Sequence, residues 1–291
     1  METEVMKQEL VAQRPVAKRG SFHADHMLSL IVAALSASVS VIGLGFPSLY
    51  RSNWGNSTSF GNDLVTLVVA VPVLAMAVIY SARGSVRARL LWFGALYYMV
   101  YNYAFYVFGI PVTKLYLPWI VIFVLSGLAF ALGLGKLDIK SIANRFSSRT
   151  PARWIAGYLS YVAVMVSFLW ISRWVKFLLT GQVPDVNGSQ SAYQVIAAVD
   201  LTFLVPLFIS AAYLLFRRRP WGYVFGAVAL VQGATYTAVM AVVCVFGWIL
   251  TPGSHLISGW FINCLVGCTL CLLCLAGLLL CARRPEISRA A

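Results

Sequence analysis

The sequence predicts an all-α integral membrane protein with eight transmembrane helices. Of its 291 residues, 60% are hydrophobic and only 11% are charged, and the mean hydropathy is +0.83. A soluble domain carries about a quarter charged residues, because its surface has to meet water. The second observation is a series of long apolar windows, and the third is an uneven distribution of basic residues between the loops that join them.

Each apolar window is about 20 residues long, the length that a helix needs to cross the hydrocarbon core. A strand of an outer-membrane barrel would instead alternate over about ten residues. The windows cover residues 27–49, 63–81, 90–110, 115–134, 154–177, 193–216, 221–250 and 257–281.

The basic residues indicate the orientation of these helices. The net charge is +13, and all but four of the 22 Lys and Arg residues lie in the two terminal segments or after the second, fourth and sixth windows. The four exceptions are Arg51, Lys114, Arg173 and Lys176. This asymmetry follows the positive-inside rule and predicts that both termini are cytoplasmic. The positive charge is therefore explained by topology, and we expect no nucleic-acid partner.

The chain is divided into five parts on this basis. We expect a cytoplasmic tail at 1–26, a first four-helix half at 27–135, a linker at 136–152, a second four-helix half at 153–282 and a second tail at 283–291. His23 and His26 fall in the first tail, where two imidazoles alone make a weak metal site. Residues 1–37 loosely resemble a signal peptide, but the apolar stretch continues to Phe46, which favours an uncleaved helix.

The linker is basic and amphipathic. Its apolar residues recur at helical spacing, at Ile139, Ile142, Ala143 and Phe146. We expect the segment Lys136–Arg149 to form a short helix on the anionic inner leaflet; a solvated loop is the alternative.

A weak internal repeat relates the two halves. Asp63-Leu64 and Pro72 in the second window resemble Asp200-Leu201 and Pro206 in the sixth. Each half then has a basic turn, a Trp, a Gly-Ala pair and one amide in mid-helix, Asn102 or Gln232. Halves of four helices keep the same orientation, so a parallel 4+4 repeat is predicted, with its axis along the membrane normal.

Polar residues within the windows are the candidate site. Such groups are costly in lipid and usually face a bundle interior or a water-filled cavity. Most fall in the outer half of the predicted helices. The candidates for substrate binding are Asp200, Asn102, Asp63, Arg173, Lys176, Gln232, Tyr101 and Asn263.

Two interpretations of these residues remain open. Asp200 pairs with Arg173 or Lys176 at an outward-open polar cavity, or else the two cations extend to the outer headgroups and Asp200 takes a neutral partner. In the second interpretation the amides only join helices. Asp63 is expected at the outer edge of its helix.

No motif for a catalytic, cofactor or metal site is present. P-loop, HExxH, GxSxG and GxGxxG patterns are absent. Four cysteines form one stripe of the last window, at Cys264, Cys268, Cys271 and Cys274. Metal binding needs thiolates, which a bilayer disfavours, so we interpret the stripe as a packing face.

Three segments carry a limited resemblance to known proteins: DLVTLVVAVP, GALYYMVYNYAFYVFG and DLTFLVP…RRRPWGYVFG. They resemble an uncharacterised class of bacterial multi-pass integral membrane proteins of unknown function. The resemblance implies a location in the cytoplasmic (plasma) membrane and transfers no catalytic residue.

Three functional hypotheses follow. The favoured one is a small-solute transporter or channel-like protein, in which Asp200 is the counter-charge or proton site and the tyrosines near Asn102 form a cavity wall. A membrane enzyme acting on a lipid-linked substrate is the second, and it requires Asp63 and Asp200 to converge. A non-catalytic sensor or assembly protein is the third, and it predicts that the protein has no cavity of ligand size.

Overall fold

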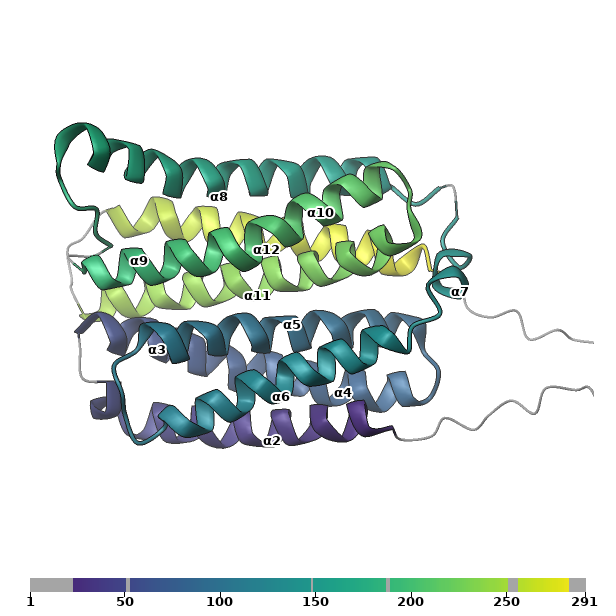
Figure 1. Cartoon of the computed structure of the whole chain (residues 1–291), viewed down its shortest axis with the longest axis horizontal. Helices are drawn as coiled ribbons and strands as arrows, with labels where there is room; N and C mark the ends of the chain where they lie inside the picture. Colours follow the sequence, from purple (N-terminus) through teal and green to yellow (C-terminus); the bar gives the residue numbers. More distant parts are fainter. Residues whose placement is uncertain (1–22, 51–52, 148, 187–188, 251–255, 283–291) are drawn as a thin grey trace, which may run out of the picture.

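The computed structural model describes residues 23–50, 53–147, 149–186, 189–250 and 256–282 (Figure 1). Its main helices are α2 (Ala24–Gly45), α3 (Asn53–Val65), α4 (Val71–Ala82), α5 (Val86–Gly109), α6 (Tyr116–Gly135), α8 (Ala152–Thr180), α9 (Gln190–Val199), α10 (Val205–Phe216), α11 (Pro220–Leu250) and α12 (Leu256–Leu280). Shorter elements are η1 (Pro47–Tyr50), α7 (Ile139–Ala143) and two π-helical turns, η2 (Thr66–Ala70) and η3 (Asp200–Leu204). The described residues form no strand.

Seven helical segments of the described chain are long and apolar enough to cross a membrane. They are Ala24–Gly45, Thr58–Ala82, Tyr116–Gly135, Ala152–Thr180, Gln190–Phe216, Pro220–Gly247 and Gly259–Leu280. These segments indicate an all-α, multi-pass membrane protein. The 24-residue helix α5 is not among them. Its tyrosines and Asn102 lower its hydropathy below that of its neighbours.

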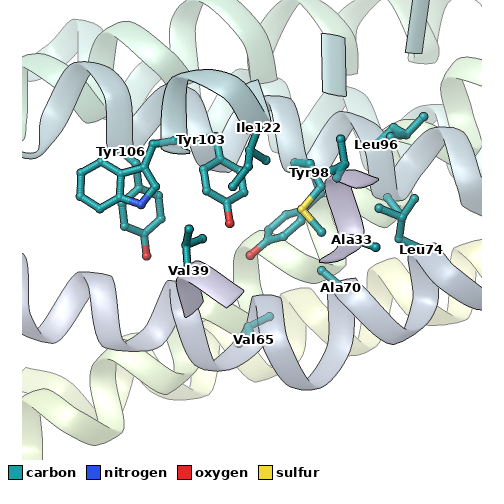
Figure 2. Packing of buried hydrophobic residues seen from close by; sticks show 14 of the residues in the cluster. Ala33, Val39, Val65, Ala70, Leu74, Leu96, Tyr98, Tyr103, Tyr106 and Ile122 are labelled. Atoms are coloured by element: carbon teal, nitrogen blue, oxygen red, sulfur yellow. The ribbon is translucent and has the colours of Figure 1, made fainter. Parts of the chain in front are cut away.

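The helices are arranged as two bundles that lie side by side (Figure 1). One contains α2, α3, α4, α5 and α6, and the other contains α8, α9, α10, α11 and α12. Each bundle has a core of buried side chains, with Trp92 and Leu96 in the first and Phe208 and Leu278 in the second, and both cores include side chains of α5 and α11. Figure 2 shows part of the first core, where Tyr98, Tyr103 and Tyr106 point from α5 toward the helices that carry Val39 and Val65.

The two bundles meet where α5 packs against α11 and α9, and where α3 packs against α11. Gly94 of α5 makes a close approach possible, because a Cβ atom there would lie 2.5 Å from the Cβ of Val231. Close helix contacts in lipid depend on such small residues, since apolar burial gives no driving force there. Large apolar side chains cover the outer faces instead, among them Leu117, Phe168 and Leu273.

One helix in each bundle is interrupted at a matching place. The turn η2 separates α3 from α4, and η3 separates α9 from α10. Proline explains both interruptions, because Pro72 and Pro206 occupy the second residue of α4 and α10. A proline lacks an N–H and its ring clashes with the carbonyl four residues earlier. Those carbonyls belong to Val68 and Thr202, at the centres of the two π turns, where the wider turn relieves the clash.

The ends of the described chain lie at one end of the molecule, next to α7 (Figure 1). Lys136, directly after α6, forms an ion pair with Asp25 at the start of α2, with an Nζ–Oδ1 distance of 2.9 Å. Arg87, at the start of α5, donates to the carbonyl of Ala282 at 2.8 Å. The basic loops of the sequence thus gather at this end.

The start of the first helix and the linker differ from the sequence-based expectation. Helix α2 begins at Ala24, so His26 belongs to it and stacks on Trp92, with ring centroids 4.7 Å apart. The linker helix covers only five residues, Ile139–Ala143. Ile142 is buried in the second core, and the other three apolar linker residues pack against that core. The amphipathic pattern therefore matches a protein surface, because α11 and its neighbours cover the apolar face.

Candidate functional site

The aromatic stretch of α5 divides into two stripes that face different partners. Tyr98, Asn102 and Tyr106 recur every four residues, and each has a hydrogen-bond partner in the first bundle. Tyr97 and Tyr101, also four residues apart, reach the second bundle. Residues four apart lie on one face of a helix, so α5 presents a polar stripe to each bundle.

Asp200 is the centre of one network and is 1% exposed. It is the first residue of η3. Its Oδ1 accepts a hydrogen bond from the hydroxyl of Tyr101. Its Oδ2 accepts from the indole Nε1 of Trp170 at 2.7 Å and from the hydroxyl of Tyr236 at 3.4 Å. These four residues, the Asp200 network, join α5, α8, η3 and α11.

The two cations proposed as partners of Asp200 do not pair with it. The guanidinium of Arg173 lies over the ring of Trp170, 5.5 Å from its centroid, and Lys176 is exposed. The ion pairs between described residues join Asp25 to Lys136 and His26, and neither Arg173 nor Lys176 takes part in them. The donors to Asp200 are all neutral, so its carboxyl is held by hydrogen bonds and not by an opposite charge.

Asp63 is the centre of a second network. It is buried within the membrane-capable segment that starts at Thr58, and not at the outer edge of its helix as expected. Its Oδ2 accepts from the hydroxyl of Tyr50, and its Oδ1 accepts from that of Tyr106 at 2.9 Å. Burial, together with the nearby carboxyl, raises the pKa of Tyr50 above its ordinary value, so this phenol stays a donor.

Among the described residues, the two carboxyl groups have no hydrogen-bond partner in common. The partners of Asp63 belong to η1 and α5, and those of Asp200 belong to α5, α8 and α11. On α5, Tyr101 and Tyr106 are five residues apart and therefore project from different faces.

A third polar group lies between the interrupted helix of the first bundle and α5. The hydroxyl of Thr66, the first residue of η2, lies 2.9 Å from that of Tyr98. The Nδ2 of Asn102 donates to the same Thr66 hydroxyl at 3.2 Å. Asn102 is 2% exposed, and this hydrogen bond gives the Nδ2 of its buried amide a protein partner.

A cavity of about 30 Å³ lies at the contact between the bundles, and we call it the interface cavity. It has room for one or two water-sized molecules. Its walls come from α3, α5, α9 and α11, and they consist of Thr58, Asn62, Tyr98, Tyr101, Asn102, Phe105, Ile196, Tyr236, Val239 and Met240. A larger hollow of about 510 Å³ lies on the outer face, between α8 and α10, and its lining is largely apolar.

The remaining candidates lie apart from the cavity. Gln232 is fully buried on α11, and within the described chain neither its Oε1 nor its Nε2 has a hydrogen-bond partner. Asn263 is exposed on α12. Tyr101 and Asn102 therefore line the interface cavity and Asp200 bonds to Tyr101, whereas Asp63, Lys176 and Asn263 are not among the lining residues.

Several residues of these networks were not among the sequence candidates. Tyr50, Tyr106, Trp170 and Tyr236 supply the donors to the two carboxyl groups. A four-residue spacing of tyrosines around Asn102 could have identified the α5 donors. Nothing in the sequence links Tyr50 or Trp170 to a carboxyl group, because those pairings arise only from helix packing.

The arrangement supplies hydrogen-bonded carboxyl groups and a small polar cavity. Among the described residues there is no group of three or more His, Cys, Asp or Glu side chains that could hold a metal ion. The cysteines of α11 and α12 are free thiols, and Cys271 lies 3.2 Å from the hydroxyl of Tyr158. No protein-family model, curated protein or solved structure matches the chain.

Proposed function

We propose that this protein moves a small solute across a membrane by relative movement of its two bundles, with Asp200 as the central polar group. One observation carries the proposal: a buried carboxyl group begins a helix interruption at the contact between the bundles. Ionisable residues inside a membrane usually mark ion or substrate pathways. Transporters commonly bind their cargo beside discontinuous helices, near the membrane midplane.

An internal repeat supports this proposal. Thr66 and Asp200 begin the π turns, Pro72 and Pro206 follow them, and α5 and α11 begin at Val86 and Pro220. Each pair has the same offset, since 200 − 66, 206 − 72 and 220 − 86 all equal 134. The offset would relate α2–α6 to α8–α12, and it supports the proposal of a 4+4 parallel repeat.

Side-chain contacts follow the same offset. Asn102 donates to Thr66, and their counterparts are Tyr236 and Asp200, which are also hydrogen-bonded. This register differs from the one expected from sequence, because Asn102 now corresponds to Tyr236 and no longer to Gln232, and Asp200 to Thr66 and no longer to Asp63.

Two contacts between the bundles are also related by this offset. A Cβ atom on Gly61 would meet Val243 at 2.6 Å, and one on Gly109 would meet Val195 at 2.8 Å. Adding 134 to residue 61 gives 195, and adding it to residue 109 gives 243. A contact and its exchanged partner are both present when two halves are related by an approximate two-fold axis.

The same repeat supports eight transmembrane helices. Its offset makes α5 the counterpart of α11, which is apolar enough to cross a membrane. We propose that α5 also crosses, shielded from lipid by its neighbours. Gathering of the basic loops at the end where the described chain starts and finishes supports cytoplasmic termini and a plasma-membrane location. Exposed Lys140 and Arg149 at that end are the proposed contacts for anionic inner-leaflet lipids.

Transport is tested in proteoliposomes. Purified protein is screened against amino acids, sugars, organic anions and inorganic cations, and any uptake is compared with that of Asp200→Asn. We expect Asp200→Asn to lose uptake while remaining monodisperse. Asp138→Asn, at the exposed cap of α7, is the matched control and keeps it. Full uptake by Asp200→Asn would contradict the role that we propose for Asp200 in transport.

Movement of the bundles is tested separately with spin labels. Val112→Cys, after α5, and Gln182→Cys, after α8, are exposed positions at one end of the two bundles. A transporter populates two conformations, so we expect two distance distributions whose proportions change with the transported solute. A single unchanging distance would favour a static protein.

A non-catalytic sensor or assembly protein is the second candidate. The small volume of the interface cavity and the neutral donors that satisfy both carboxyl groups favour it. This candidate predicts that the protein tolerates substitution of Asn102. The lipid-linked enzyme receives no such support, because Asp63 and Asp200 belong to separate networks.

A further inference from the structure

The interface cavity lies on the approximate two-fold axis. Three of its lining residues are the counterparts of three others under the 134-residue offset: Asn62 and Ile196, Asn102 and Tyr236, and Phe105 and Val239. A site on such an axis receives groups from both bundles and is altered whenever they move against each other. The cavity is therefore the place where a bound ligand would couple to movement.

The polar lining of the cavity is rich in oxygen atoms. Thr58, Asn62 and Asn102 contribute a hydroxyl and two amide groups, and three tyrosines add phenols. The Nδ2 of Asn62 donates to the carbonyl of Thr58 at 3.1 Å, which fixes the orientation of that amide. The Nδ2 of Asn102 donates to Thr66. Across the described chain, no hydrogen bond uses the Oδ1 of either asparagine, and both amide oxygens remain as ligands.

The carboxyl group of Asp200 lies directly behind this lining. Tyr101 and Tyr236 both line the cavity and both donate to the Asp200 carboxyl. That carboxyl has no cation within ion-pair distance among the described residues.

We propose that the interface cavity binds one dehydrated monovalent inorganic cation, with the amide oxygens of Asn62 and Asn102 as direct ligands. Hard cations prefer oxygen ligands, and a volume of about 30 Å³ admits an ion but not an organic solute. A divalent ion is disfavoured because its protein sites use direct carboxylate ligands, and none lines this cavity. Asp200 supplies the single balancing charge through its two tyrosines.

The proposal rests on the proposed function only for the role of the cation as a coupling ion; binding itself needs no transport. The full chain in detergent is titrated by calorimetry with NaCl, KCl and NH4Cl, each against choline chloride at equal ionic strength. We expect saturable binding of one cation per chain for at least one salt, and a higher unfolding temperature in that salt. The preferred salt identifies the ion.

Variants locate the site. Asn102→Leu is expected to weaken binding at least tenfold, whereas Asn102→Asp, which keeps an oxygen ligand, retains it. Asn62→Ala gives a second route if Asn102→Leu does not fold. Asn263→Leu, on the exposed face of α12, is the matched control and binds like the unaltered chain.

Two results would overturn the proposal. One is no saturable binding of any of the three cations, which would leave only water in the cavity. The other is that Asn102→Leu and Asn62→Ala both bind the cation as tightly as the unaltered chain. Binding without solute uptake would leave the cation site intact and count against transport. Solute uptake without cation binding would count against the cation site and leave the transport proposal intact.

Discussion

At the scale of single residues, the buried carboxyl groups are stabilised by phenols and an indole and not by cations. A carboxyl group in a low-dielectric interior is costly unless its oxygens accept hydrogen bonds. Asp63 takes two phenols from η1 and α5, and Asp200 takes two phenols and Trp170. The aromatic donors also fill volume, so the same side chains pack the core and satisfy the polar groups.

Removing one donor of Asp63 measures this stabilisation. Tyr106→Phe keeps the ring and deletes the hydroxyl that donates to Asp63 at 2.9 Å. We expect the free energy of unfolding to fall by about 1–3 kcal/mol, because a buried acceptor loses a partner. Tyr161→Phe, on the exposed face of α8, is the control and changes it by less than about 0.5 kcal/mol. Equal effects in chemical unfolding would mean that the Asp63 bond contributes nothing.

A glycine pair in α2 tests the closeness of packing around the same carboxyl. A Cβ atom on Gly43 would overlap the hydroxyl of Tyr50 and the Oδ2 of Asp63, whereas one on Gly45 would meet nothing within 4 Å. We expect Gly43→Ala to lower the free energy of unfolding by about 1–3 kcal/mol through overpacking. Gly45→Ala is expected to be neutral or slightly stabilising, because alanine favours the helix. Thermal unfolding of the two variants under one condition decides between them.

At the scale of elements, the interrupted helices and α5 determine where polar groups can meet. Pro72 and Pro206 force a π turn in each bundle, and the first residue of each turn bonds to the next long helix. Helix α5 serves both bundles because its two stripes face opposite networks. The cavity therefore depends on the contact between α5 and α11.

The contact between α5 and α11 can be tested with a double-mutant cycle. Gly94→Ala places a methyl group against Val231, and we expect a loss of about 1–3 kcal/mol in stability. Val231→Ala makes room for that methyl, so the double variant should recover part of the loss. The expected coupling energy is about 0.5–3 kcal/mol, as for residues in direct contact. Simple additivity of the two losses would show that the helices do not touch at this point.

At the scale of the whole molecule, the cores of the two bundles meet along α5 and α11, since each core includes buried side chains of both helices. The exposed apolar side chains of α6, α8 and α12 suit a lipid surface around both bundles.

Membrane orientation is tested by cysteine labelling in a variant without native cysteines. Ser141→Cys in α7 and Gln182→Cys after α8 are exposed positions at opposite ends of the molecule. We expect an impermeant maleimide added to intact cells to modify position 182 and to reach position 141 only after lysis. Labelling of both positions in intact cells, or of position 141 alone, would contradict cytoplasmic termini.

The sequence alone determined the helical membrane class, because length and hydropathy dictate which segments can satisfy their backbone in lipid. Its Asp and Pro pairs also predicted an internal repeat, and the repeat that we propose uses another register. Only the tertiary structure decided the partners of each polar residue. Asp200 meets Tyr101 and Trp170 through packing between helices distant in the chain, and Asp63 meets Tyr50 of η1 in the same way. Periodicity defines the faces of a helix, but the packing of bundles decides what each face contacts.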